Sequence, residues 1–385
     1  MIPYGKQDIG QADIDAVIDV LKSDWLTQGP AIERFERSVA DYCGARYAVA
    51  VSNGTAALHL ACLALDIGEG QEVWTSPNTF VASANCARYC GADVDFVDID
   101  SRTYNLSTSL LESKLAQRSN EGRKPAALIP VHFAGQPCDM EAIGGLAKRY
   151  SCAVIEDASH AIGSSFAGRK TGSCDYSDMV VFSFHPVKIV TSGEGGMILT
   201  NRDDLYQRLL RLRTHGITRN AADMTELAHG PWYYQQTELG YNYRITDIQA
   251  ALGASQMQRL EEFVTRREYL ACRYDVALAD LPLIRPWQDA RTRSSWHLYV
   301  VRLRTDSIRP SHREVFESLR AAGIGVNLHY IPVHTQPYYQ ALGFKSGMFP
   351  EAERYYREAI SLPMYASLSD QDQDHVIAAL HRILK

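Results

Sequence analysis

Lys188 is the residue of this sequence best placed to react as an amine. An apolar stretch, Met179–Phe184, leads to it, and the glycine-rich segment Gly193–Gly196 separates it from a second apolar stretch, Met197–Thr200. We expect a buried strand on each side and a partly desolvated lysine between them. Burial lowers the pKa of a lysine and makes its lone pair available for reaction. The alternative interpretation is an ordinary hairpin whose lysine extends to the surface.

Asp157 is a candidate partner for a ligand cation. It ends the apolar stretch Ala153–Asp157, which predicts a strand, and the small residues Ala158 and Ser159 follow it. A carboxylate kept ionised in such a sheltered place could pair with a cationic ring nitrogen. Alternatively, the same carboxylate could simply cap a following helix.

A third candidate element is the polar turn Ser52–Thr55. It follows the short apolar stretch Tyr47–Val51 and precedes a helix expected from Ala56 to about Leu65. A strand, a small polar turn and a helix N-terminus together bind phosphate, because the first amides point outward with the positive end of the helix dipole behind them. The alternative is a plain helix cap. The sequence has no Walker lysine and no GxGxxG, so neither a P-loop nor a dinucleotide site is predicted.

The candidate residues together match the needs of one cofactor. Pyridoxal 5'-phosphate (PLP) requires an amine for its aldehyde, an anion for its pyridine nitrogen, a flat partner for its ring and a cup for its phosphate. Lys188, Asp157, Phe80 and the turn at residues 52–55 could supply these four. No other common cofactor explains all of them.

Alternating strands and helices must position these residues. The strands are expected at residues 47–51, 72–77, 93–99, 126–133, 153–157, 179–184 and 197–200. Helical patterns between them predict parallel pairing, helices on both faces of the sheet, and a site along the carboxyl ends of the strands. Phe80, His132, Asp157 and Ser183 each follow such an end, so we expect them on one rim.

The length of 385 residues predicts two domains, because single cores rarely grow beyond roughly 250 to 300 residues. We place a large domain at residues 1–255 and a smaller C-terminal domain at residues 256–385. A long helix over residues 248–267 should carry the chain out of the first domain. The later elements expected are strands at 296–301 and 325–330, a helix at 313–322 and a terminal helix from about residue 371.

Composition excludes several classes of protein. The net charge of -6 and the lack of a basic patch argue against nucleic-acid binding. The eight cysteines form no CxxC pair or metal-like cluster, which is typical of buried thiols in a reducing compartment and predicts no metal site. No signal-peptide pattern opens the chain and no run of about 18 apolar residues occurs, so we expect a cytoplasmic protein.

The chain resembles the DegT/DnrJ/EryC1/StrS nucleotide-sugar aminotransferases, which belong to the fold type I PLP enzymes. The resemblance covers nearly the whole length, and the SFHPVK-GEGG and GYNYR blocks are highly specific together. It rests on SNGTAALHLA (52–61), TSPNTFVASAN (75–85), EDASHAIGS (156–164), SFHPVKIVTSGEGG (183–196), LRTHGI (212–217), GYNYRITDIQAALG (240–253) and the HYIPVHTQPYY region (329–339). It implies a large domain with a mostly parallel sheet and a smaller α/β domain.

The resemblance also implies roles for individual residues. Lys188 would bind the cofactor aldehyde covalently and later move a proton, and Asp157 would keep the pyridine nitrogen protonated. Phe80 and Ser159 would contact the two ring faces, and His160 the phenolic oxygen. The phosphate would be held by Gly54, Thr55, Ser183 and, from a second subunit of a homodimer, Asn242.

The implied reaction is ping-pong transamination, in which an amino acid, expected to be glutamate, aminates the cofactor and a 4-keto nucleotide sugar receives the amine. The segments IPYGKQDIGQADID, WLTQGP and GIGVNLHYIPVH are most similar to the branch that makes UDP-4-amino-4,6-dideoxy-N-acetyl-L-altrosamine for pseudaminic acid. Residues expected to contact the substrate are Tyr4, Asp24, Trp25, Leu26, Thr27, Ser183, Asn242, His329 and Tyr330.

Three rival functions differ in testable features. A dehydratase of the same family would carry histidine in place of Lys188. A non-catalytic relative acting as a partner subunit would not need the intact lysine, aspartate and phosphate turn. An amino-acid aminotransferase or decarboxylase of the same fold would need a carboxylate-binding arginine pattern, which is missing.

Overall fold

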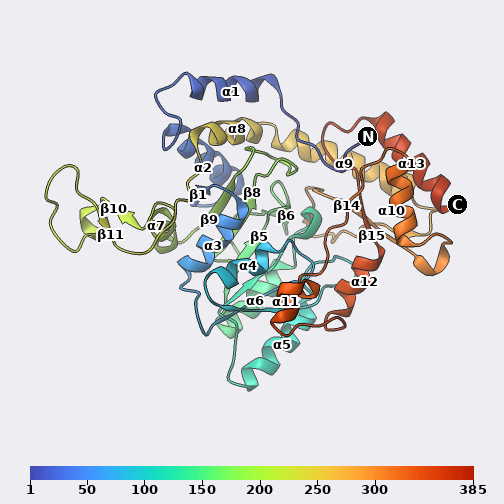
Figure 1. Cartoon of the computed structure of the whole chain (residues 1–385), viewed down its shortest axis with the longest axis horizontal. Coiled ribbons are helices and arrows are strands. Elements are labelled where there is room, and N and C mark those ends of the chain that lie inside the picture. Colours follow the sequence, from blue (N-terminus) through green and yellow to red (C-terminus); the bar gives the residue numbers. More distant parts are fainter.

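A seven-stranded sheet forms the centre of the molecule in the computed structural model, which describes all 385 residues (Figure 1). Its strands, in spatial order, are β1 (Tyr47–Val51), β9 (Gly196–Thr200), β8 (Met179–Ser183), β5 (Ala153–Asp157), β4 (Ala127–Ile129), β2 (Glu72–Thr75) and β3 (Asp93–Phe96). From β8 to β3 every pair is parallel, whereas β9 is antiparallel to both of its neighbours. The predicted mostly parallel α/β fold is confirmed.

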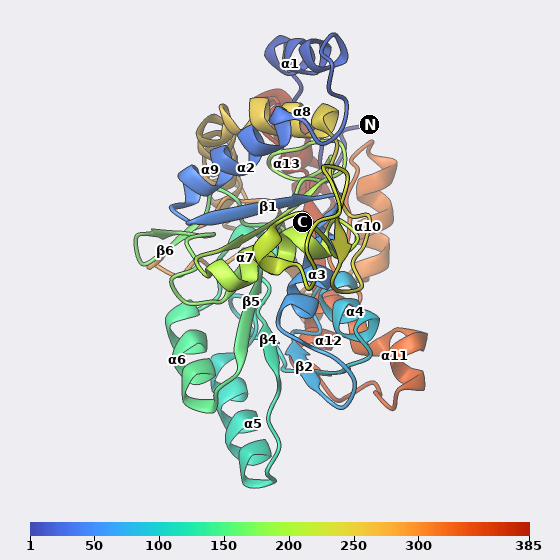
Figure 2. The same cartoon turned by 90° about the vertical axis from the view of Figure 1, so that its left-hand side faces the viewer.

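Helices cover both faces of this sheet, because its strands are apolar on both sides. On β1, Val49 and Val51 pack into the same core cluster as α3, while Ala48 and Ala50 pack into the cluster that contains α2 and α8. The long helices are α1 (Gln11–Leu21), α2 (Pro30–Cys43), α3 (Gly54–Ala64), α4 (Ala82–Tyr89), α5 (Thr108–Asn120), α6 (Met140–Tyr150), α7 (Asp203–Leu212), α8 (Asp247–Met257), α9 (Leu260–Ala277), α10 (His312–Ala321), α12 (Pro350–Glu358) and α13 (Asp370–Leu384). Figure 2 shows α2 and α8 above the sheet, with α1 outside them.

The C-terminal part has a sheet of its own, with β14 (Tyr299–Leu303) between β12 (Leu283–Ile284) and β15 (Ala359–Leu362). Both pairs in this sheet are antiparallel. Helices α9, α10 and α13 contribute to the core cluster around it. The predicted domain boundary near residue 255 stays a prediction.

Two of the connections between the C-terminal part and the rest of the chain are main-chain pairings near the site. β13 (Thr292–Arg293) pairs with β6 (Ser165–Phe166), which also pairs with β7 (Arg169–Lys170). At the N-terminus, the Ile2 amide donates to the Gly323 carbonyl at 2.8 Å, and the Gly325 amide donates to the Ile2 carbonyl at 2.6 Å. The first residues therefore lie beside the segment that leads to His329.

A hairpin arm extends from the body of the molecule after α7 (Figure 1). Its paired strands are β10 (Ile217–Thr218) and β11 (Gln235–Gln236), and residues 217–240 form the arm. Leu227 is 90% exposed and Trp232 is 73% exposed. Both are among the most exposed large apolar side chains of the molecule.

Two expected elements differ from the structure. Residues 325–330 form no strand and have only a single bridge, Asn327 to Ser361, because the Tyr330 amide donates to the Asn78 side chain instead of to a neighbouring strand. The long helix expected over residues 248–267 is two helices, α8 and α9, which meet at Gln258 and Arg259.

The remaining short elements are η1 (Phe133–Gly135), η2 (Ala221–Asp223), η3 (Thr305–Ser307), η4 (Val333–Thr335) and α11 (Pro337–Ala341). None of the helices has the length and apolarity needed to cross a membrane.

Candidate active site

A cavity of about 880 Å³ lies between the carboxyl ends of the central strands and the segment around residues 327–330. Two of the central strands end in it, β5 at Asp157 and β8 at Ser183. The predicted site residues that line it are Tyr4, Gly54, Thr55, Phe80, Asp157, Ser159, His160, Ser183, Lys188, His329 and Tyr330. Residues far apart in the sequence therefore meet in one place.

Lys188 lies in the connection between β8 and β9, where its amide donates to the His185 carbonyl at 2.9 Å. The walls of the cavity shield its amine from bulk water, and this burial lowers the pKa of Lys188 to about 8, against the opposing effect of the Asp157 carboxylate. The amine thus becomes neutral within reach of physiological pH, as a nucleophilic lysine requires.

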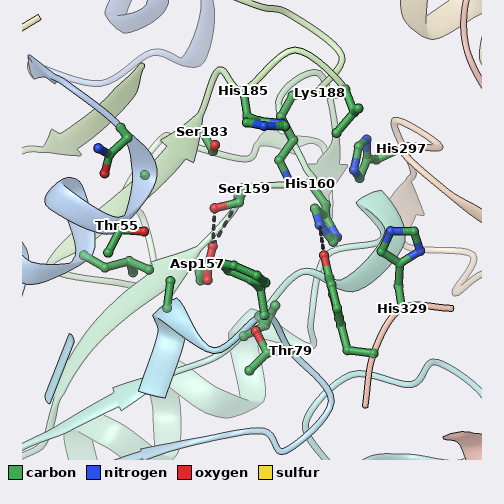
Figure 3. A pocket seen from close by; sticks show the side chains of 18 of the residues that line it. Thr55, Thr79, Asp157, Ser159, His160, Ser183, His185, Lys188, His297 and His329 are labelled. Carbon is green, nitrogen blue, oxygen red and sulfur yellow. Dashed lines mark hydrogen bonds between the residues drawn. The ribbon is translucent and has the colours of Figure 1, made fainter. Parts of the chain in front are cut away.

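Three buried histidines, His160, His297 and His329, occupy the same end of the cavity (Figure 3). Burial lowers the pKa of each, and the nearby charge of Lys188 lowers it further. All three are therefore neutral at pH 7. His160 Nδ1 accepts from the Ala134 amide at 3.3 Å, so its Nε2–H donates to the Tyr330 hydroxyl at 3.0 Å.

Asp157 faces the cavity from the end of β5 and is only 4% exposed. Its Oδ1 accepts from the Ser159 hydroxyl at 2.6 Å and from the Ser159 amide at 3.1 Å. Its Oδ2 accepts from the Ser83 hydroxyl at 2.6 Å. Hydrogen bonds of this kind stabilise the ionised form of a buried carboxylate.

The turn before α3 has the form of an anion cup. Asn53 caps the helix, and its Oδ1 accepts from the Ala56 amide at 2.8 Å. The first main-chain bond of the helix joins the Ala57 amide to the Asn53 carbonyl, so the Gly54 and Thr55 amides have no partner within the helix. Ser183 lies alongside, since a Cβ added to Gly54 would be 3.0 Å from Ser183 Cβ.

Comparisons with known proteins show which family has this arrangement. A family model described as the DegT/DnrJ/EryC1/StrS aminotransferase family matches residues 7–381. The chain belongs to this family. It is 40% identical over 387 residues to the spore coat polysaccharide biosynthesis protein SpsC of Bacillus subtilis, with 100% of this chain and 97% of SpsC covered.

Solved structures agree with this assignment. Helicobacter pylori PseC, an aminotransferase involved in the biosynthesis of pseudaminic acid, superposes with a TM-score of 0.90 at 28% identity, over 100% of this chain and 99% of PseC. Spr1654 of Streptococcus pneumoniae in its PMP form superposes with a TM-score of 0.90 at 30% identity, over 100% of this chain and 99% of that one. Spr1654 has also been solved in a PLP form. This chain is a PLP-dependent sugar aminotransferase.

The site of this aminotransferase fits PLP on its own geometry. A shielded amine, a hydrogen-bonded carboxylate and two unpaired helix amides line a single cavity. In Figure 3, Thr55 and Ser183 lie at one end, His160, His297 and His329 lie at the other, and Asp157 lies between them. When bound, PLP supplies an aldehyde that takes up an amine and a ring that accepts electrons.

Aromatic side chains close the wall of the cavity. Phe80 is 58% exposed and lies at the rim, with its ring centroid 6.2 Å from that of Tyr330. Tyr4 lies with its ring centroid 5.4 Å from that of His329, and its carbonyl accepts from the Met364 amide at 3.0 Å. The N-terminal segment is thus part of the wall.

Five predicted site residues lie outside this cavity. Asp24, Trp25, Leu26 and Thr27 belong to the connection between α1 and α2, where Trp25 is 54% exposed. Asn242 follows the arm and forms a bridge with Thr214. Within one chain, neither the 24–27 connection nor Asn242 contributes to the cavity wall.

The expectation that His132 lies on the rim is wrong. Its side chain is fully buried, its Nε2 lies 2.6 Å from Glu156 Oε2, and its Nδ1 accepts from the Cys138 amide at 3.1 Å. Neighbouring residues of an extended strand point to opposite faces, so Val131 lines the cavity and His132 does not.

Sequence reasoning also missed residues that the structure places in the site. His297 lines the cavity with a buried Nδ1 that has no hydrogen-bond partner, although it was expected only as part of a C-terminal strand. Thr79 lines the cavity, and Ser83 reaches Asp157 from α4. Their positions in the TSPNTFVASAN block (75–85) were the available signal.

Proposed function

We propose that this aminotransferase transfers an amino group from an amino acid, L-glutamate, to the keto carbon of a 4-keto-6-deoxy nucleotide sugar. The observation that carries the proposal is the shielded amine of Lys188 in the same cavity as the Asp157 carboxylate, which accepts three hydrogen bonds. The family assignment supplies the class of substrate, and the site supplies groups for the chemistry.

We assign the site residues as follows. Lys188 holds the cofactor and, once released from it, moves a proton at the substrate carbon, because its lowered pKa lets it both accept and donate near pH 8. Asp157 keeps the ring nitrogen of the cofactor protonated. The Gly54 and Thr55 amides with the Ser183 hydroxyl bind the phosphate.

Three further residues position the cofactor ring. Phe80 covers one face from the rim, and Ser159 packs against the other while holding Asp157 Oδ1. His160 is assigned to the phenolic oxygen. The Nε2–H of His160 already donates to the Tyr330 hydroxyl, so His160 and Tyr330 would approach the phenolic oxygen together.

The sugar would bind the wall formed by Tyr4, His329 and Tyr330. The hydroxyl and imidazole groups of this wall can pair with sugar hydroxyls, and no arginine is among the 26 residues that line the cavity. We propose UDP-2-acetamido-2,6-dideoxy-beta-L-arabino-hex-4-ulose as the substrate, giving UDP-4-amino-4,6-dideoxy-N-acetyl-beta-L-altrosamine for pseudaminic acid. The similarity to PseC supports it, and another UDP- or dTDP-4-keto sugar is the alternative.

We further propose a cytoplasmic homodimer with shared sites. The exposed apolar arm offers an interface, and Asn242 and the 24–27 connection would reach the cavity of the partner. All eight cysteines are free, which suits a reducing compartment.

The attachment of the cofactor can be tested by borohydride reduction of the holoenzyme followed by peptide mapping. We expect a pyridoxyl group on Lys188 alone, and Lys188→Ala should lose the aldimine absorption band and all turnover. A label on another residue would contradict the proposal. A wild-type protein without visible absorption would favour the non-catalytic relative.

The substrate can be tested with the aminated cofactor form of the enzyme. Mixing it with a panel of 4-keto nucleotide sugars and with keto acids should restore the PLP spectrum fastest with the UDP-linked 4-keto sugar named above. Faster recovery with a keto acid other than 2-oxoglutarate, which the proposed donor itself forms, would indicate an amino-acid aminotransferase. Faster recovery with a dTDP-linked sugar would support the alternative substrate.

A further inference from the structure

Ser83 is the most informative residue that the assigned roles leave unused. It lies in the first turn of α4, is fully buried, and places its Oγ 2.6 Å from Asp157 Oδ2. Thr79 Oγ1 lies 2.6 Å from the same Ser83 Oγ. Three side chains thus form a chain of short hydrogen bonds that ends on the carboxylate.

The direction in which these hydroxyl groups donate hydrogen bonds follows from the carboxylate that ends the series. An ionised carboxylate only accepts hydrogen bonds, and Ser83 has a single hydroxyl proton. That proton therefore goes to Asp157, and Thr79 must donate to Ser83. The Phe80 carbonyl, 3.4 Å from Ser83 Oγ, competes poorly for the same proton.

The two oxygens of Asp157 are not equally occupied. Oδ1 accepts two hydrogen bonds from Ser159, whereas Oδ2 accepts one, from Ser83. Each carboxylate oxygen has about two acceptor sites, so Oδ2 keeps one site free. The oxygen held by Ser83 is the one able to accept a further N–H donor.

We propose that Ser83, supported by Thr79, is a positioning residue that keeps Asp157 ionised and presents Oδ2 to the ring nitrogen of the cofactor. This inference rests on the role proposed for Asp157. Removing the Ser83 hydroxyl would leave a buried charged oxygen with one donor fewer, and losses of hydrogen bonds to charged groups are costly. The affinity should therefore fall for ligands that pair with the charge of Asp157.

The test compares two ligands and three variants. Apoproteins of wild type, Ser83→Ala and Thr79→Val are titrated with PLP and with its carbocyclic analogue, in which carbon replaces the ring nitrogen. The matched control is Ser38→Ala, because Ser38 is also a helical serine, but its Oγ donates to a main-chain carbonyl, that of Phe35, at 2.8 Å. No carboxylate contacts Ser38.

We expect Ser83→Ala to weaken PLP binding about tenfold and to leave binding of the carbocyclic analogue within about twofold of wild type. Thr79→Val, which keeps the side-chain shape, should weaken PLP binding by about threefold and spare the analogue. Ser38→Ala should change neither constant. Thr79→Val also keeps the inference testable if Ser83→Ala fails to fold.

Three other results would overturn the inference. Equal losses for both ligands would show that Ser83 only maintains structure. Unchanged PLP binding in Ser83→Ala, with wild type still preferring PLP over the analogue, would refute the role of Ser83 and leave that of Asp157 intact. A wild type that binds both ligands equally would refute the role of Asp157 and, with it, that of Ser83.

Discussion

At the scale of the residue, the chemistry depends on how burial in the cavity shifts the pKa values of its basic groups. Burial holds the pKa of His329 at about 3 and lowers that of Lys188 to about 8, with Lys188 adding to the effect on the histidine. Neutral imidazoles place no second positive charge beside the amine. The only counter-charge that opposes its loss of a proton is Asp157.

The stability of the apoprotein should report this shift. The folded pKa of Lys188 is about 8, below the ordinary value of 10.5 that applies to the unfolded chain. Between these values the unfolded chain binds more protons, so the contribution of Lys188 to stability rises with pH. Urea unfolding from about pH 7 to pH 10 should show wild type gaining stability relative to Lys188→Met. A difference in the free energy of unfolding that stays constant or falls as the pH rises would contradict the lowered pKa of Lys188.

Much of the site was predictable at this scale, and the reason is local. Asp157 and Ser183 end apolar strands, and strand ends meet at one edge of a parallel sheet. His132 was misassigned because its side-chain direction depends on where the strand begins its alternation. His297 could not be derived, because it reaches the cavity from the start of the C-terminal sheet through contacts that no local pattern encodes.

At the scale of the element, the phosphate cup depends on the start of β9. A Cβ added to Gly196 would lie 2.4 Å from the Asn53 carbonyl oxygen and 2.9 Å from the Gly54 amide nitrogen. Only glycine lets the strand pass so close to the turn that caps α3. The GEGG block thus shapes two features, the position of Lys188 and the cup.

Gly196→Ala should therefore damage cofactor binding. The displaced turn would lower PLP affinity by at least about tenfold and the free energy of unfolding by about 1 to 3 kcal/mol, as overpacking does. Gly145→Ala in α6 is the control, because a Cβ there meets no atom within 4 Å. It should leave PLP affinity unchanged and raise stability by about 0.5 to 1 kcal/mol. Wild-type affinity in Gly196→Ala would refute this account of the cup.

Helices and strands were predictable where a clear periodicity of apolar residues coincides with residues that mark the ends of the element. The central strands and α10 with its Ser311 cap follow this rule. The segment 325–330 has a strand composition, but its Tyr330 amide is taken by Asn78 from a distant loop. The break between α8 and α9 carries neither proline nor glycine at Gln258 or Arg259, so no local signal marks it.

At the scale of the whole molecule, one chain leaves part of the predicted site unused. The cavity lacks Asn242 and the 24–27 connection, while Leu227 and Trp232 of the arm are exposed. A second copy of the chain would explain both observations, because it would cover the apolar arm and bring distant residues to the cavity. Closed dimers place such contacts symmetrically.

Complementation between two inactive variants can decide whether the sites are shared. Lys188→Ala lacks the amine, and Asn242→Ala lacks the proposed phosphate contact, so each homodimer should have strongly reduced activity. If Asn242 acts across the interface, a mixed dimer has one site with an intact lysine and an intact Asn242 from the partner. Unfolding and refolding an equal mixture should then restore roughly a quarter of wild-type activity. If Asn242 serves its own chain, every site keeps one defect and no activity returns.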